Sequence, residues 1–177
     1  MLVEPKLQEV VTGKRGMLTG IQACLDAQCL VSAVTLMFST IDALAALTRP
    51  VKQLDTNSTI FREWTIRFLQ PDRRLGCTAQ DLWGARCGVL HTYSPEANVA
   101  AKQGARRIFY RWRAGPPVDA TRQIPAGSLV LVAEDLHAAL VDGARDYMLA
   151  AMAEPHLKDR LQAHLPPLLC YEPFPTP

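Results

Sequence analysis

The chain has 177 residues, of which 49% are hydrophobic and 20% are charged, and its formal net charge is only +2. This length predicts one domain with a substantial buried core, or one domain with a small appendage. The longest apolar stretch without a charge, residues 27–41, is too short for a membrane span and fits a core helix. We therefore expect no membrane contact, and the lack of a signal-peptide pattern at the N-terminus predicts a cytoplasmic location.

Cysteine usage points to the same compartment. The number of cysteines is odd and no Cys-x-x-Cys pair occurs; they are Cys24, Cys29, Cys77, Cys87 and Cys170. A free cysteine in an apolar helix packs as a small hydrophobic residue, which suits a reducing environment. No His, Asp and Glu residues have metal-ligand spacing, and a Gly-rich phosphate loop is absent. We expect neither a metal nor a cofactor.

Positive charge is concentrated in the middle of the chain. Residues 61–113 contain ten Arg and Lys against four Asp and Glu, whereas residues 114–177 contain four against eight. This asymmetry is compatible with an anionic partner such as RNA, for which Arg73 and Arg74 are candidate contacts. The alternative is that these arginines only solvate the outer faces of helices and turns.

Apolar residues recur at helical spacing from Met17 to Leu47. The segment 29–47 is the most hydrophobic, and Arg49-Pro50 should end it. A break near Ala27-Gln28 would give two antiparallel helices, and a single bent helix is the alternative. Before this segment, residues 1–16 resemble a leader with at most a helical turn.

Two further helices follow in the basic part of the chain. Residues 59–70 place Phe61, Trp64 and Phe68 on one face, which predicts a packed helix. A second helix should begin after Thr78 as its N-cap, with Asp81 in its first turn, and should stop before Ser94-Pro95. A short helix through about residue 102 should come next.

The pattern then changes to that of β-strands. Residues 106–113 alternate, with Ile108, Tyr110 and Trp112 on one face, and residues 128–132 form a second β-rich run. The two runs could pair as a small antiparallel ribbon across a long loop. We expect the aromatic face to cover the helices; base stacking by these aromatics is the alternative. Arg111 and Arg113 remain candidate RNA contacts.

The C-terminal part returns to helix over residues 133–153 and about 156–164, followed by a proline-rich tail over 166–177. We interpret three scattered histidines there as surface residues: His137, His156 and His164. The predicted fold class is therefore mainly all-α, a helical bundle with a small two-stranded β ribbon inserted before the C-terminal helices. It forms one domain over residues 17–165, with the ribbon at about 106–132.

Arg86 and His91 are the strongest candidates for chemistry. Five residues on an ideal helix turn about 140° and climb about 7.5 Å, so a long arginine side chain can still reach the histidine. A fixed cation beside a titratable group suits binding and cleavage of a phosphodiester. Asp42 lies in the apolar helix upstream, where it either faces solvent or pairs with Arg86 and fixes the guanidinium.

At this point the sequence resembles the HEPN domains (higher eukaryotes and prokaryotes nucleotide-binding). They are helical bundles with an Arg-x4–6-His motif at the end of a core helix, which the stretch Leu82–His91 matches closely. The resemblance covers residues 17–95. It implies a metal-independent endoribonuclease of toxin or defence type that acts as a homodimer on RNA, with an antitoxin protein as a possible partner.

On that resemblance His91 is the general acid or base and Arg86 stabilises charge on the phosphate, leaving a 2′,3′-cyclic phosphate. Asp42, Cys87 and Tyr93 are the supporting residues of the predicted site. Cys87 stands where many nuclease members carry a polar residue. The alternative is therefore a catalytically inactive helical interaction or nucleotide-binding module.

Overall fold

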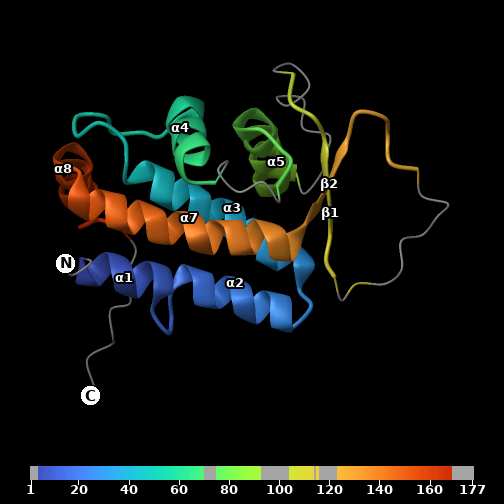
Figure 1. Cartoon of the computed structure of the whole chain (residues 1–177), viewed down its shortest axis with the longest axis horizontal. Coiled ribbons are helices and arrows are strands. Elements are labelled where there is room, and N and C mark those ends of the chain that lie inside the picture. Colours follow the sequence, from blue (N-terminus) through green and yellow to red (C-terminus); the bar gives the residue numbers. More distant parts are fainter. Residues whose placement is uncertain (1–3, 70–74, 93–103, 114, 116–122, 169–177) are drawn as a thin grey trace.

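A computed structural model describes residues 4–69, 75–92, 104–113, 115 and 123–168, and within them the protein is mainly helical (Figure 1). A small two-stranded sheet lies between the fifth helix and the C-terminal helices, which confirms the predicted fold class. The elements are α1 (Pro5–Thr12), α2 (Met17–Asp26), α3 (Leu30–Ala46), α4 (Ser58–Phe68), α5 (Ala79–Thr92), β1 (Ile108–Arg111), β2 (Leu129–Val132), α7 (Ala133–Ala153) and α8 (Pro155–His164).

The helices form three layers, and α3 and α7 make up the middle layer (Figure 1). Helices α1 and α2 lie on one side of this central pair, and α4 and α5 lie on the other. The α3 sequence explains its central place, because eight of its residues are buried and together form one wide face of the helix. A buried face of this width must be covered by several neighbours, and α3 contacts α2, α4, α5 and α7.

The segment 17–47 forms two helices, which settles the choice between two helices and one bent helix. Helix α2 ends in a Schellman motif: the Gln28 amide donates to the Leu25 carbonyl at 2.9 Å, and the Cys29 amide donates to the Cys24 carbonyl at 2.8 Å. The motif needs a left-handed residue after the C-cap, and Gln28 provides it with φ of 57°. Glycine usually occupies this position because a Cβ is disfavoured there.

We expect Gln28→Gly to raise the free energy of unfolding by about 1 kcal/mol, because it removes the strain of a Cβ in the left-handed region. The matched control is Ala27→Gly, one residue earlier, where φ is −80° and glycine only adds entropy to the unfolded chain. Urea unfolding of both variants checks this. A lower midpoint for Gln28→Gly would show that the side chain stabilises the turn through other contacts.

The segment expected to be a leader contributes to the core. Residues 5–12 form the whole of helix α1, and Leu7 and Val11 are fully buried in the main hydrophobic cluster. The Lys6 ammonium donates to the Pro166 carbonyl at 2.8 Å, so the beginning of the described chain is tied to the segment after α8. The packed unit therefore includes residues before Met17. Residues 169–177 of the predicted tail lie outside the described residues.

The sheet is parallel, so the predicted antiparallel pairing was wrong. Ile108 pairs with Leu129 and Arg111 with Val132 in the same direction. Parallel neighbours need a long connection that returns the chain to the starting end, and residues 112–128 are long enough to provide it. The predicted inner face is confirmed: Ile108 is buried, and Tyr110 and Trp112 pack against the main hydrophobic cluster.

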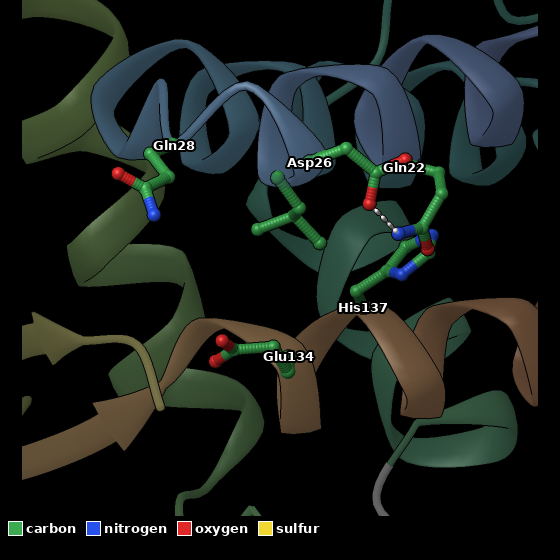
Figure 2. Close-up of a pocket in the computed structure, with 6 residues that line it drawn as sticks. Gln22, Asp26, Gln28, Glu134 and His137 are labelled. Atoms are coloured by element: carbon green, nitrogen blue, oxygen red, sulfur yellow. Dashed lines mark hydrogen bonds between the residues drawn. The ribbon is translucent and has the colours of Figure 1, made fainter. Parts of the chain in front are cut away.

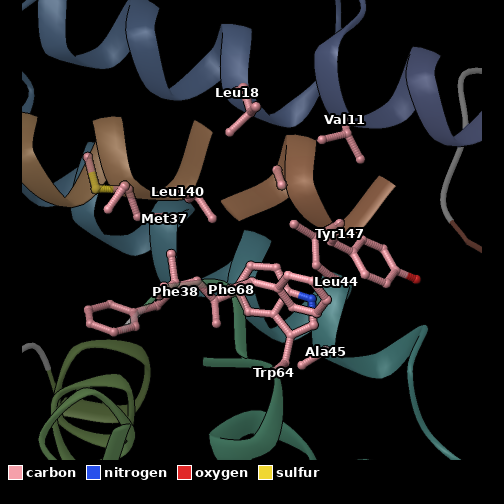
Figure 3. Packing of buried hydrophobic residues seen from close by; sticks show 14 of the residues in the cluster. Val11, Leu18, Met37, Phe38, Leu44, Ala45, Trp64, Phe68, Leu140 and Tyr147 are labelled. Atoms are coloured by element: carbon pink, nitrogen blue, oxygen red, sulfur yellow. The ribbon is translucent and has the colours of Figure 1, made fainter. Parts of the chain in front are cut away.

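The core contains an aromatic cluster between α4 and α7, formed by Trp64, Phe68 and Tyr147 (Figure 3). The Tyr147 ring meets both others edge-on, with centroid distances of 6.3 Å to Trp64 and 5.5 Å to Phe68. Gly143 lets the two helices approach, because a Cβ at this position would lie 2.6 Å from the Phe68 carbonyl oxygen. This contact holds α4 at a fixed distance from α7.

Two of the three late histidines are not surface residues. His164 is buried, with Nε2 3.3 Å from the Pro50 carbonyl oxygen, because α8 docks onto the segment that follows α3. His137 is half-buried between α7 and α2, and only His156 is exposed as predicted. Among the described helices, none combines the length and the apolar character that crossing a membrane would require.

Candidate functional site

Helix α5 carries the predicted motif, and a capping box fixes its start. The Thr78 hydroxyl accepts the Asp81 amide at 3.1 Å, and the Asp81 carboxylate accepts the Thr78 amide at 2.9 Å. These reciprocal bonds satisfy two donors at the helix start and confirm Thr78 as the N-cap. Helix α5 is described as far as Thr92, and the predicted stop before Ser94-Pro95 and the short helix expected after it lie outside the described residues.

Asp81 also ties α5 to the sheet through a residue that the sequence did not indicate. The Arg106 guanidinium donates to Asp81 Oδ2 at 2.6 Å, and the Arg106 amide donates to Oδ1 at 2.7 Å. Burial alone would raise the pKa of the Asp81 carboxyl, but the bonds from Arg106 and Thr78 outweigh it and hold that pKa below its ordinary value. Burial and this carboxylate raise the pKa of the neighbouring Cys77 thiol to about 11, so the thiol is neutral.

We expect Asp81→Asn to lower the free energy of unfolding at pH 7 by about 2 kcal/mol, because a charge-assisted bond to Arg106 is lost. Because the pKa of the Asp81 carboxyl is lowered in the folded state, its ionised form stabilises the protein at pH values above the ordinary pKa near 3.8. This stabilisation is lost as the pH falls through the folded-state pKa. Urea unfolding at pH 7 and pH 3 should therefore show the gap between variant and wild type closing in acid. If the free energies of unfolding of variant and wild type differed equally at pH 7 and pH 3, the ion pair would not be the source of the difference.

The ion pair between Asp42 and Arg86 brings α3 and α5 together, as the second of the two sequence interpretations predicted. Arg86 Nε donates to Asp42 Oδ2 at 2.8 Å, and Nη2 lies 2.8 Å from the same oxygen. The side chains are 22% and 27% exposed, so the pair lies at the protein surface with one side open. Burial lowers the pKa of Arg86, but Asp42 raises it more, and the guanidinium is always charged.

The opposite edge of the same guanidinium faces His91. Arg86 Nη1 lies 3.1 Å from His91 Nε2, so the arginine does reach across the five-residue spacing. A guanidinium nitrogen can only donate, and Nε2 must therefore be the accepting, unprotonated nitrogen of the imidazole. The His91 side chain is exposed in the last turn of α5. The arrangement thus offers a fixed cation and a basic nitrogen side by side at an accessible surface.

An aromatic ring and a thiol complete the surroundings of Arg86. The guanidinium carbon lies 5.2 Å from the centre of the Trp83 ring, which itself packs edge-on against Phe61. Cys87, the next residue on α5, is buried. Carboxylate and ring together restrict the rotation of Arg86. The sequence did not indicate Trp83, although its position three residues before Arg86 on the helix was a usable signal.

The structure describes two of the four arginines that were predicted to contact RNA, Arg111 and Arg113. Arg111 is exposed on β1. Arg113 forms an ion pair with Asp135, and its amide donates to the Glu134 carboxylate at 2.9 Å, so this arginine helps to attach the sheet to α7. Arg73, Arg74 and Tyr93 lie outside the described residues. Within the described ranges, no three His, Cys, Asp or Glu side chains are grouped to hold a metal ion.

No protein-family model matches the chain, and neither does any curated protein or solved structure.

Proposed function

We propose that this protein is an HEPN-like RNA-binding protein and a metal-independent endoribonuclease that acts as a homodimer. The observation that carries the proposal is the contact between Arg86 Nη1 and His91 Nε2 at 3.1 Å, with Asp42 holding the other edge of the guanidinium. The proposal includes a cytoplasmic toxin or defence role with an antitoxin protein as partner, as the resemblance implies.

In the proposed reaction the scissile phosphate takes the Nη1 hydrogen bond of Arg86, and this frees His91 Nε2 to take the proton of a ribose 2′-hydroxyl as that oxygen attacks the adjacent phosphorus. The new 2′-oxygen–phosphorus bond replaces the bond to the 5′-oxygen of the next nucleotide, which leaves with a proton from water or from the second copy's imidazole. Arg86 stabilises the negative charge that builds up on the non-bridging oxygens. The products are a 2′,3′-cyclic phosphate and a 5′-hydroxyl.

Asp42 is the positioning residue of this proposal. A surface arginine samples many rotamers, and holding it in one geometry before the substrate arrives lowers the entropy lost on binding. The carboxylate engages Nε and Nη2, so Nη1 is the nitrogen left toward His91. One phosphate oxygen placed between the two groups would contact both.

The test is incubation of the wild-type protein with a defined single-stranded RNA in EDTA, followed by analysis of the product ends. The proposal expects cleavage with 2′,3′-cyclic phosphate and 5′-hydroxyl ends. A matched substrate with a single 2′-deoxy nucleotide at the cleaved position should resist cleavage there, because it lacks the attacking oxygen. Cleavage of that substrate at the same position, or 5′-phosphate ends, would contradict the proposed chemistry.

One observation favours a second candidate, a catalytically inactive helical interaction or nucleotide-binding module. Arg86 already makes two contacts to Asp42 and lies over Trp83, which is how an arginine that only joins two helices would be held. This candidate expects no cleavage by the wild type. It also expects Arg86→Ala to destabilise the protein, and for the nucleotide-binding form it expects thermal stabilisation by a nucleotide.

A further inference from the structure

Two cysteines lie at the turn between α2 and α3, toward the other end of α3 from Asp42. Cys24 lies in the last turn of α2, and Cys29 precedes α3 as its N-cap residue. Figure 2 shows this end of α2, with Asp26 and Gln28 labelled beside a pocket that faces α7. Cys24 is half-buried and packs against the main hydrophobic cluster, whereas Cys29 is exposed. One thiol of the pair is therefore accessible to a reagent in solution.

The Schellman motif that ends α2 brings the two cysteines together. They occupy the two positions of this motif whose side chains commonly touch, and the Cys29 amide donates to the Cys24 carbonyl at 2.8 Å. With standard bond lengths, a hydrogen bond of this length holds the two Cα atoms at most about 6.7 Å apart. Disulfides join Cα atoms that are about 4.4–6.8 Å apart, so the backbone already lies within the range that a disulfide needs.

The turn also orients the exposed thiol. Gln28 lies between the two cysteines, and its left-handed φ of 57° turns the chain back over the end of α2. The Cys29 thiol donates to the Ala27 carbonyl at 3.6 Å, so its sulfur lies beside the C-cap residue of α2. The exposed sulfur is therefore turned toward the helix that carries Cys24.

We propose that Cys24 and Cys29 are a site of reversible oxidation, at which a low-molecular-weight disulfide converts the two thiols to an internal disulfide. The Cys29 thiolate attacks one sulfur of the reagent, whose S–S bond breaks and whose other half leaves as a thiolate that takes up a proton. The Cys24 thiolate then attacks the Cys29 sulfur of this mixed disulfide and releases the second reagent thiol. The two protein thiols lose two electrons and two protons, and the reagent disulfide gains them.

The new bond closes the turn between α2 and α3 across the strained Gln28. Folding holds the two sulfurs close and so favours the disulfide, and by reciprocity the disulfide favours the folded state by the same factor. The thiol–disulfide balance of the solution therefore sets part of the stability of the protein. The cysteine pair shares no residue with the Arg86 site, so the proposal does not depend on the proposed ribonuclease activity.

The test is equilibration of the full chain with mixtures of reduced and oxidised glutathione, followed by alkylation of the remaining thiols and mass spectrometry of tryptic peptides. Residues 16–52 form one tryptic peptide that contains these two cysteines and no other, because Arg49 precedes Pro50. We expect this peptide to carry an internal disulfide. The equilibrium constant for its formation should be at least about tenfold larger in the folded protein than in the same chain in urea, because the folded turn raises the effective concentration of one thiol at the other.

Single variants test the two roles. Cys24→Ser should leave Cys29 as a mixed disulfide with glutathione, because no second thiol is present to displace it. The control is Cys77→Ser, which removes a half-buried cysteine outside this turn and should form the internal disulfide as the wild type does. A wild type that stops at the mixed disulfide, an equilibrium constant no larger in the folded protein than in urea, or loss of the internal disulfide in the control variant would overturn the proposal.

Discussion

His91→Ala should lower kcat/KM for RNA cleavage by about 10³-fold, because it removes the group that takes the 2′-hydroxyl proton. The fold should be unaffected, since the His91 side chain is exposed in the last turn of α5 and is not part of the hydrophobic core. Initial rates on a fluorescent single-stranded RNA in EDTA measure the loss. Circular dichroism and the thermal midpoint should match those of the wild type.

The control for this prediction is His156→Ala, which removes an exposed histidine from α8. It should cleave at the wild-type rate, which would show that the loss in His91→Ala is specific to that histidine. If His91→Ala cleaved as fast as His156→Ala, the assignment of His91 would be wrong.

Tyr147→Ala should destabilise the protein by about 3–5 kcal/mol, the largest stability effect that we expect from a single substitution. Tyr147 is fully buried and contacts Trp64 and Phe68 across the interface between α4 and α7. Removal of the ring leaves a cavity beside a close contact at Gly143, where the helices have little freedom to move together. The free energy of unfolding from urea titration measures the effect.

The matched variant Tyr147→Phe separates the ring from its hydroxyl. The hydroxyl oxygen is buried without a hydrogen-bond partner among the described residues, so its removal should be neutral or stabilising. A Phe variant as unstable as the Ala variant would show that the hydroxyl, and not the ring, carries the contribution of this side chain.

The helices could be predicted because their apolar residues repeat at helical spacing. The helix over residues 133–153 has the predicted bounds, and the Asp42–Arg86 pair follows from a carboxylate in an apolar helix that needs a partner. Local spacing also predicted that Arg86 would reach His91. These features depend on residues within one helix or on the cost of burying a charge.

The remaining features depend on how segments that are distant in sequence pack against one another. The spacing of apolar residues along the chain carries no information about this packing. The two strands pair in parallel, whereas alternation of apolar residues predicts a strand without its direction. The Asp81–Arg106 pair joins residues far apart in sequence, and the burial of His164 requires α8 to meet Pro50. Each of these contacts is specified by tertiary packing.

The most direct test of the central claim, that Arg86 and His91 form a phosphodiester site, is NMR of the His91 ring during titration with a non-cleavable 2′-O-methyl dinucleotide. We predict saturable shifts of the His91 signals, with His156 unchanged, and loss of these shifts in Arg86→Lys, whose ammonium cannot contact Asp42 and the phosphate together in the same planar geometry. Unchanged His91 signals in the wild type, or equal shifts at His91 and His156, would contradict the claim.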